Sequence, residues 1–316
     1  MRLVVAYHLE GYTMRGLAFI LAGLMLVSVA GFVSAHSITV DGNPTDWLAD
    51  TSTQSINTWQ VYTAVGEGVF KDNTTDYRTD NGAVSSWADI DEFRVTSDSD
   101  YVYFLITFTN LSGVGTLGTN GGTFLAIAIN DGTGTGTAFA GNSDTYTYNS
   151  TAGTGMEWKY QVVINLAASN YSGLGYTSAT VTPDTNWGAL FYIVNDSWNF
   201  QQPSGALMAV SLPNNAIEIR LPRTLFSSTN LQFEVMAANG QSNYANNVGG
   251  TWDIGGSSIS NAVDVVTDVS GNTWNEVSDG VVDYYVSLDV SQVPFFGSVA
   301  VVLAAVLGMV LIFRRR

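Results

Sequence analysis

Residues 93–109 read FRVTSDSDYVYFLITFT. Two runs rich in β-branched and aromatic residues, Glu92–Thr96 and Tyr101–Thr109, flank the acidic stretch Ser97–Asp100. Such runs favour β-strands because branched and aromatic side chains pack well on a pleated sheet, whereas Asp and Ser favour turns because they hydrogen-bond the local backbone. The stretch therefore predicts two strands joined by a short turn.

The same pattern continues in both directions along the chain. No run of ten or more residues has helical periodicity outside the two ends, and Gly, Asn, Asp and Ser separate the apolar runs. Further strands are expected at Ser37–Val40, Trp59–Val65, Thr123–Asn130, Asp144–Asn149, Glu157–Leu166, Ala189–Asn195, Leu207–Ser211, Ala216–Leu221, Leu231–Ala237 and Val281–Val290. We therefore predict an all-β fold, an antiparallel β-sandwich over residues 36–290, in which Asn239–Ser278 forms a loop-rich part.

The C-terminal end predicts a membrane anchor. Val293–Phe313 contains 21 residues without a charge, and Arg314–Arg316 follow as a basic tail. A helix of that length, at about 1.5 Å per residue, spans roughly the 30 Å hydrocarbon core of a bilayer. The basic tail is expected to stay in the cytoplasm, so the residues before Val293 are expected outside the cell.

The N-terminal end predicts an export signal over residues 1–35. Arg15 precedes the apolar run Gly16–Val33, and Val33-Ser34-Ala35 fits the small-residue pattern of a cleavage site. A start at Met14 gives a more compact signal than a start at Met1. An uncleaved N-terminal anchor is the alternative.

The composition limits the chemistry of the expected ectodomain. Only one of the 27 acidic residues but five of the 11 basic residues lie outside residues 36–292, which leaves this part with a net charge of −20. Such a surface repels nucleic acid, and it suits cations or simply solubility. The chain has no cysteine, and His36 is the only histidine of this part, so thiol chemistry, a Ser-His-Asp triad and the common zinc sites are excluded. We predict that the chain is not an enzyme.

Four segments resemble one family. Residues 38–47, ITVDGNPTDW, resemble the entry to the family 9 carbohydrate-binding modules and related DOMON-type sandwiches, as in glucodextranase-type C-terminal modules. Three later segments are similar to the same family in the same order: Phe93–Phe108, Phe124–Gly136 and Asn215–Phe226. The last contains Glu-x-x-Leu-Pro, Glu218 to Pro222, which in such folds is an edge strand that leaves the sheet at proline. The resemblance implies a carbohydrate ligand and one structural calcium ion.

The tail also resembles a known signal. Val293-Pro294-Phe295-Phe296-Gly297, followed by an apolar span and basic residues, is similar to archaeal C-terminal sorting signals of the Pro-Glu-Phe or Pro-Gly-Phe kind. The middle residue of that signature is absent here. Processing by a sorting enzyme is therefore secondary to a plain membrane anchor.

Oxygen-rich turns offer candidate ligands for Ca²⁺. They are Asp41 with Asp46, Asp89 with Asp91 and Glu92, Asp98 with Asp100, and Asn130 with Asp131. Asp and Asn also bond their own backbone in turns, which is the alternative reason for their presence. We take Asp89, Asp91 and Asp131 as the metal ligands. A glycosidase pair among Asp89, Asp91 and Glu92 carries little weight, because acids are so frequent here that close pairs arise by chance.

Aromatic residues offer candidate binding surfaces. The flat face of a sugar ring stacks on an indole, so tryptophans in loops are candidates: Trp198, Trp252 and Trp274. Trp47, Trp59 and Trp158 are expected in the core. Five Asn-x-Ser/Thr sequons are candidate glycosylation sites: Asn73, Asn110, Asn149, Asn170 and Asn195.

Together these features predict a single-pass protein of the cell membrane with an extracellular glycan-binding module. Its partners would be a cell-surface or environmental polysaccharide and the membrane. The alternative is a structural envelope protein, S-layer-associated or self-assembling, that contacts neighbouring surface proteins and has no small-molecule ligand. The Gly-, Ser-, Thr- and Asn-rich, cysteine-free composition supports that alternative.

Overall fold

The computed structural model describes residues 38–77, 89–111, 123–137, 156–166, 176–186, 189–239, 262–268, 282 and 284–290. The predicted export signal, membrane span and basic tail lie outside these ranges. Within the ranges, no helix has both the length and the apolar character needed to cross a membrane.

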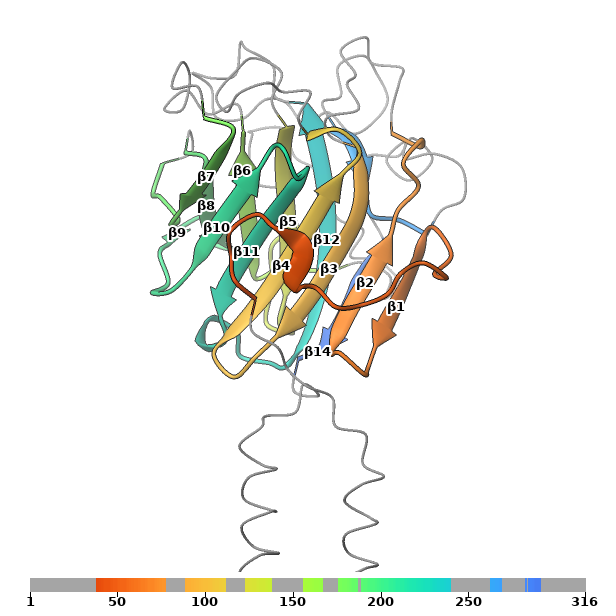
Figure 1. The fold of residues 1–316 in the computed structure, drawn as a ribbon. Coiled ribbons are helices and arrows are strands. Elements are labelled where there is room, and N and C mark those ends of the chain that lie inside the picture. Colours follow the sequence, from red (N-terminus) through yellow and green to blue (C-terminus); the bar gives the residue numbers. More distant parts are fainter. Residues whose placement is uncertain are drawn as a thin grey trace, which may run out of the picture.

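Two antiparallel sheets form the described fold (Figure 1). The first has the order β1-β2-β3-β4-β11-β10-β7, and the second has the order β13-β12-β5-β6-β8-β9, with β14 also paired to β12. The first sheet consists of β1 Thr58–Tyr62, β2 Glu67–Lys71, β3 Ile90–Ser97, β4 Tyr101–Phe108, β7 Ser178–Val181, β10 Leu207–Ser211 and β11 Ala216–Pro222. The second consists of β5 Thr123–Asn130, β6 Tyr160–Asn165, β8 Phe191–Asn195, β9 Phe200–Gln201, β12 Asn230–Asn239, β13 Ala262–Val265 and β14 Val286–Asp289. Two short 3-10 helices are η1 Pro44–Asp46 and η5 Arg223–Leu225.

One apolar core lies between the sheets, because alternate residues of each strand face it. Phe93 and Phe104 of the first sheet contact Phe233 of the second, with ring centroids 6.0 and 5.5 Å from it. Burial of each such ring contributes about 1.5–3 kcal/mol. The predicted all-β, antiparallel architecture is thus confirmed, and the two sheets pack as a sandwich.

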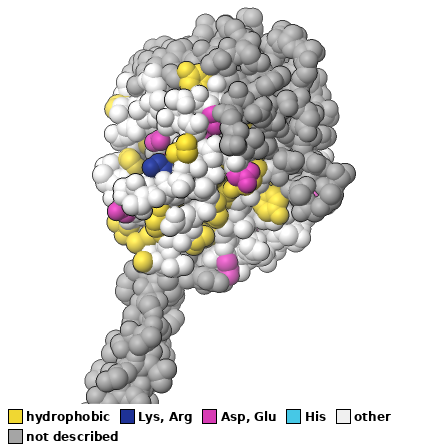
Figure 2. Space-filling view, turned by 90° about the vertical axis from the view of Figure 1, so that its right-hand side faces the viewer, with side chains coloured by type: hydrophobic (Ala, Val, Ile, Leu, Met, Phe, Trp, Pro, Cys, Tyr) yellow, Lys and Arg dark blue, Asp and Glu magenta, His cyan; other side chains and the backbone are white. Residues whose placement is uncertain are grey.

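Outside this core lie a second apolar cluster and a surface of mixed composition. A second apolar cluster, around Trp158 and Tyr192, covers the outer side of the second sheet. On the side of the molecule in Figure 2, most of the described surface is backbone or side chains that are neither apolar nor charged, and apolar and acidic side chains lie among them.

The segment Ile38–Thr51, which we call the N-terminal strap, crosses the outer face of the first sheet (Figure 1). Its buried contacts join Ile38, Val40 and Trp47 of the strap to Tyr103, Leu105, Ala209 and Ala216 of the sheet. Glu218 of β11 accepts hydrogen bonds from the backbone N of Asp41 at 3.0 Å, the backbone N of Gly42 at 2.8 Å and Nε1 of Trp47 at 3.0 Å. Gly42 has φ +79°, a conformation that favours glycine at this turn.

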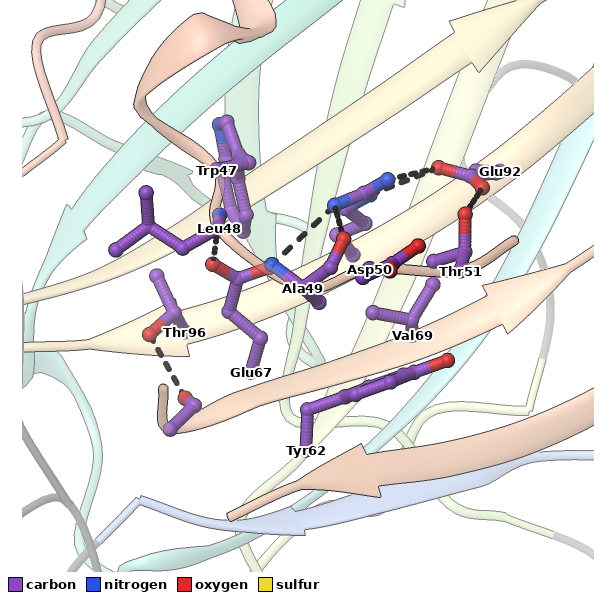
Figure 3. A network of polar contacts seen from close by, with 12 residues as sticks. Trp47, Leu48, Ala49, Asp50, Thr51, Tyr62, Glu67, Val69, Glu92 and Thr96 are labelled. Carbon is purple, nitrogen blue, oxygen red and sulfur yellow. Dashed lines mark hydrogen bonds and ion pairs between the residues drawn. The ribbon is translucent and has the colours of Figure 1, made fainter. Parts of the chain in front are cut away.

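A second glutamate fixes the far end of the strap (Figure 3). Glu67 of β2 accepts hydrogen bonds from the backbone N atoms of Leu48 at 2.6 Å and Ala49 at 3.2 Å. Arg94 of β3 lies 3.5 Å from Glu67 and donates from Nε to Glu92 at 2.8 Å. Every charged group of this network therefore has a partner of the opposite charge or a hydrogen-bond donor.

Several predicted boundaries need correction. Ile38–Val40 is not a strand: its residues alternate between buried and exposed because the strap packs on a sheet, and Glu218 and Asp46 take the place of strand pairing. The strand that ends at Pro222 is not an edge strand, because β11 lies between β4 and β10. The sequence also missed β2, β7 and β9, and it assigned the region of β13 to a loop.

Candidate metal centre

Three aspartates from separate parts of the chain meet in the interior. Asp76 follows β2, Asp89 directly precedes β3, and Asp264 lies on β13. One carboxylate oxygen of each lies within 4.8 Å of the other two. The residues are only 2%, 0% and 0% exposed, respectively. The described fold thus buries three carboxylates at one point.

Asp72 is a fourth acidic group beside this cluster. Asp72 is buried, and its backbone N donates to the carbonyl of Asp91 on the neighbouring strand at 2.8 Å. The intervening turn is held by Asn73, whose Oδ1 accepts from the backbone N and the hydroxyl of Thr75 at 3.3 and 3.0 Å. This turn brings Asp76 back towards Asp72. We call Asp72, Asp76, Asp89 and Asp264 the aspartate cluster.

Most oxygens of the aspartate cluster lack a hydrogen-bond donor. Both oxygens of Asp76, both of Asp89 and Oδ2 of Asp72 are buried without a partner. Asp264 differs, because its two oxygens accept from the backbone N atoms of Ile90 at 2.7 Å and Val265 at 2.9 Å. Ion pairs between described residues involve Arg94 and Lys159, and none of them reaches the cluster. Buried carboxylates normally have such partners, so these five unpartnered oxygens are available to bind a positive group.

The electrostatics agree with this geometry. Burial raises the pKa of Asp76 to about 6. Burial also raises the pKa of Asp89 to about 7, while the Thr109 hydroxyl, near Asp89 but outside hydrogen-bond geometry, acts in the opposite direction. The pKa of Asp72 lies well above its usual range because of burial and then because of the charges of Asp264 and Asp76. Without a cation the cluster therefore favours protonated carboxyls, and a bound cation would favour the ionised form.

The donor set defines the kind of ion that fits. All the candidate ligands are carboxylate oxygens, which are hard donors preferred by Ca²⁺ and Mg²⁺ and less suited to metals that prefer sulfur or imidazole. Asp76 and Asp89 each offer two unpartnered oxygens, so each can bind an ion through one or both. The aspartate cluster can thus hold a hard divalent cation.

The sequence predicted one of these residues. Asp89 is a member of the cluster, but the structure does not bring Asp91 or Asp131 to it. Asp91 lies 3.4 Å from the Thr107 hydroxyl. Asp131 accepts from the backbone N and hydroxyl of both Thr133 and Ser227, and these bonds lower its pKa although burial alone would raise it. Asp131 therefore has the role of a turn residue.

Three members of the cluster were missed, and each left a weak signal. Asp72 and Asp76 flank the sequon at Asn73 within five residues, where only a glycosylation site was predicted. Asp264 interrupts the apolar run Ala262–Val266, where an acid is costly unless it has a partner. The sequence could not show that these residues meet, because their contact depends on how the two sheets pack.

Trp198 is the predicted ligand-binding residue that the structure describes. It lies in the turn between β8 and β9 with φ +61°, and it is 42% exposed. Its ring packs edge-on against the buried Trp158, with centroids 5.4 Å apart. Oδ1 of Asn195 accepts from the backbone N atoms of Ser197 and Asn199, which fixes the turn. Trp198 is therefore an exposed aromatic ring on a defined support.

The remaining predicted residues divide into two groups. The sequon residues Asn73, Asn110 and Asn195 are half-buried in the described fold. Trp252, Trp274, Asn149 and Asn170 lie outside the described residues. Trp47 and Trp158 are buried and Trp59 packs against the main core, as predicted.

Comparisons with known proteins do not assign a family. No protein-family model matches the chain, and no curated protein is similar to it in sequence. The resemblance to carbohydrate-binding modules stays a prediction, and the candidate function depends on the geometry above.

Proposed function

We propose that this chain is a membrane-anchored, extracellular β-sandwich module that binds one structural Ca²⁺ ion and holds a glycan at the cell surface. The observation that carries the proposal is the group of five buried carboxylate oxygens without a protein partner. Burying carboxylates without partners destabilises the folded state, and a bound cation would compensate for that loss.

Calcium suits the cluster better than magnesium. Ca²⁺ accepts six to eight oxygens in flexible geometry and tolerates carboxylates that bind through both oxygens, whereas Mg²⁺ demands a compact octahedron and keeps several of its waters. Asp76 and Asp89 both have two oxygens available, and little water fits among side chains that are almost fully buried. The expected extracellular location also supplies calcium at the concentrations that structural modules use.

A calorimetric titration tests the calcium part. The purified full-length chain, kept in detergent and depleted with EDTA, is titrated with CaCl₂ and, separately, with MgCl₂ at about pH 7.5, where the carboxylates can ionise. We expect one Ca²⁺ per chain, much weaker binding of Mg²⁺, and loss of most of the Ca²⁺ affinity in Asp89→Asn. Asp131→Asn is the matched control, because Asp131 is a buried turn aspartate outside the cluster, and it should bind Ca²⁺ like the wild type. Absence of binding by the wild type would reject the calcium site.

Trp198 supports the glycan part. Its exposed ring has a fixed support in Trp158 and no need to reorganise before a sugar stacks on it, which keeps the entropic cost of binding low. Uncharged polar residues nearby, Asn199 of the same turn and Gln201 of β9, can bond sugar hydroxyls. Neither feature is restricted to one sugar, so the polysaccharide class stays open.

A polysaccharide array with the full-length chain tests this part. We expect that Trp198→Ala weakens binding to any polysaccharide found by about tenfold or more, the scale for loss of a central aromatic contact. Trp198→Phe, which keeps an aromatic face, should retain part of the affinity. Tyr176→Ala is the control, because Tyr176 is a similarly exposed aromatic residue that lies two positions before β7. Equal binding by wild type and Trp198→Ala would remove Trp198 from the proposal.

The second candidate is a structural envelope protein. In its favour, the large aromatic side chains exposed on the described part of the chain are only Trp198 and Tyr176. If the array finds no polysaccharide and the chain self-associates in calcium-containing buffer, the structural role replaces the glycan-binding role.

A further inference from the structure

The aspartate cluster joins the two sheets of the sandwich. Asp72 and Asp76 follow β2 and Asp89 precedes β3, so three ligands belong to the first sheet. Asp264 lies on β13, which is the terminal strand in the order of the second sheet. We infer that the cation acts as a clamp that holds β13 against the first sheet, so that β13 is docked in the calcium-bound protein and released when calcium is removed. This inference rests on the calcium site proposed above.

The pairing of β13 with its own sheet is limited. Its partner β12 matches it at three positions, Met236 with Val265, Ala237 with Asp264, and Ala238 with Ala262. The register shifts between Ala237 and Ala238, so even this short ladder is interrupted. Such an irregularity weakens a ladder, and a short terminal strand with few hydrogen bonds is where local opening is expected.

Apolar contacts contribute to holding the rest of this segment. Val265 belongs to the outer apolar cluster of the second sheet, and Val266 belongs to the core between the sheets. The backbone N of Val266 also donates to the carbonyl of Val235 at 3.1 Å. These contacts favour the docked state, but they involve only a few side chains.

Without a cation, the carboxylates of the aspartate cluster that are ionised repel one another and oppose docking. Asp264 brings one of its carboxylate oxygens within 4.8 Å of those of Asp76 and Asp89. Asp264 is also tied to the first sheet by its bond from the backbone N of Ile90 at 2.7 Å. A cation converts this repulsion into attraction, because all four carboxylates can then share one positive charge centre.

The strand β14 provides an internal control. It pairs with the same strand β12, from Asn230 with Asp289 to Phe233 with Val286. Like β13 it has four residues, but none of them belongs to the aspartate cluster. The inference therefore predicts that calcium changes the opening of β13 and not that of β14.

Hydrogen exchange measured by mass spectrometry tests the clamp. The full-length chain in detergent is compared in millimolar CaCl₂ and in EDTA at about pH 7.5, with calcium binding measured on the same sample. We expect the backbone amides of residues 262–268 to exchange at least about tenfold faster in EDTA, with β14 and β4 unchanged. Asp264→Asn should abolish the difference in exchange of residues 262–268 between the two buffers, and Asp131→Asn should behave like the wild type.

The outcomes separate the clamp from the site itself. If calcium binds but residues 262–268 exchange equally in both buffers, the clamp is wrong and the calcium site stands. If EDTA speeds exchange to the same extent in every strand, the cation supports the whole sandwich, and the specific role of β13 is again wrong. If no calcium binds, the site and the clamp are rejected together.

Discussion

The paired strands β2 and β3 have a group of buried carboxylates near each end. Protein donors surround the carboxylates of one group, whereas two carboxylates of the other group have none. At one end, Glu67 accepts from two backbone N atoms and faces Arg94, which also binds Glu92 (Figure 3). At the other end, Asp76 and Asp89 have no donor for any of their four oxygens. Both groups are almost fully removed from solvent.

This difference in hydrogen-bond donors separates a buried carboxylate that stabilises the fold from one that can bind a cation. Burial of a carboxylate does not by itself identify a binding site, since Glu67 is as buried as Asp89. The number of donors around the oxygens separates the two cases, because a carboxylate with bonds to the protein is part of the fold, and one without them lacks a partner.

The largest effect is expected from Glu67→Ala. This change removes one of the two carboxylates that pair with Arg94, and it leaves two backbone N atoms of the strap without an acceptor. We therefore expect a loss of about 3–5 kcal/mol in the free energy of unfolding. Denaturant unfolding of the full-length chain measures it, with and without calcium. The loss should be the same in both conditions. A loss that disappears in EDTA would mean that the two carboxylate groups are not independent.

Calcium itself should have the next largest effect. A ligand at one hundred times its Kd stabilises the folded state by about 2.7 kcal/mol, and the unfolded chain has no preformed site. We expect an increase of about that size for the wild type at saturating calcium, and little increase for Asp89→Asn. Thermal unfolding with calcium or with EDTA gives the comparison. Asp91→Asn, which alters a predicted ligand outside the cluster, should keep the wild-type increase.

The pH dependence without calcium has a definite sign. The pKa values of about 6 for Asp76 and about 7 for Asp89 exceed the value of 3.8 for an unperturbed Asp. Between about pH 4 and pH 7 the folded state thus binds more protons than the unfolded state, so these two groups make stability fall as pH rises through that window. With calcium the carboxylates are already ionised and the fall should vanish. Unfolding midpoints in EDTA across this range measure the effect, and Asp89→Asn should flatten the slope.

Trp198→Ala should have the smallest effect on stability. The ring is partly exposed, and its edge-on packing against Trp158 is worth about 0.5–1.5 kcal/mol. We expect a loss of about 1 kcal/mol, with calcium binding unchanged. Trp158→Ala, which removes a fully buried side chain, is the contrasting variant and should cost about 3–5 kcal/mol. Equal losses for the two variants would show that Trp198 is a core residue.

The strands were largely predictable from the sequence. The bounds of β5 and β10 agree with the predicted ones, because alternating or continuous apolar runs between turn residues define them locally. The strap was mistaken for a strand because Ile38 and Val40 follow the same alternation when they pack on a sheet. The strand β13 was missed because its four residues lie in a long Gly- and Asn-rich region.

The candidate site was much less predictable. Local chemistry identified Asp89 as an acid in an oxygen-rich segment, but it gave the same weight to Asp131, which the fold surrounds with the donors of Thr133 and Ser227. The distinction depends on Asp264, which is 175 positions away from Asp89 in the sequence. Only the packing of one sheet on the other brings such residues together.

A crystal structure of the chain grown with calcium would show whether the aspartate cluster binds an ion. We predict one ion in the aspartate cluster, with oxygens of Asp72, Asp76, Asp89 and Asp264 at about 2.3–2.6 Å from it, the range for Ca²⁺ ligands. Glu67 and Glu218 should keep their present hydrogen bonds to the strap. A structure at saturating calcium in which the four aspartates bind no ion and instead bond to one another or to water would contradict the account.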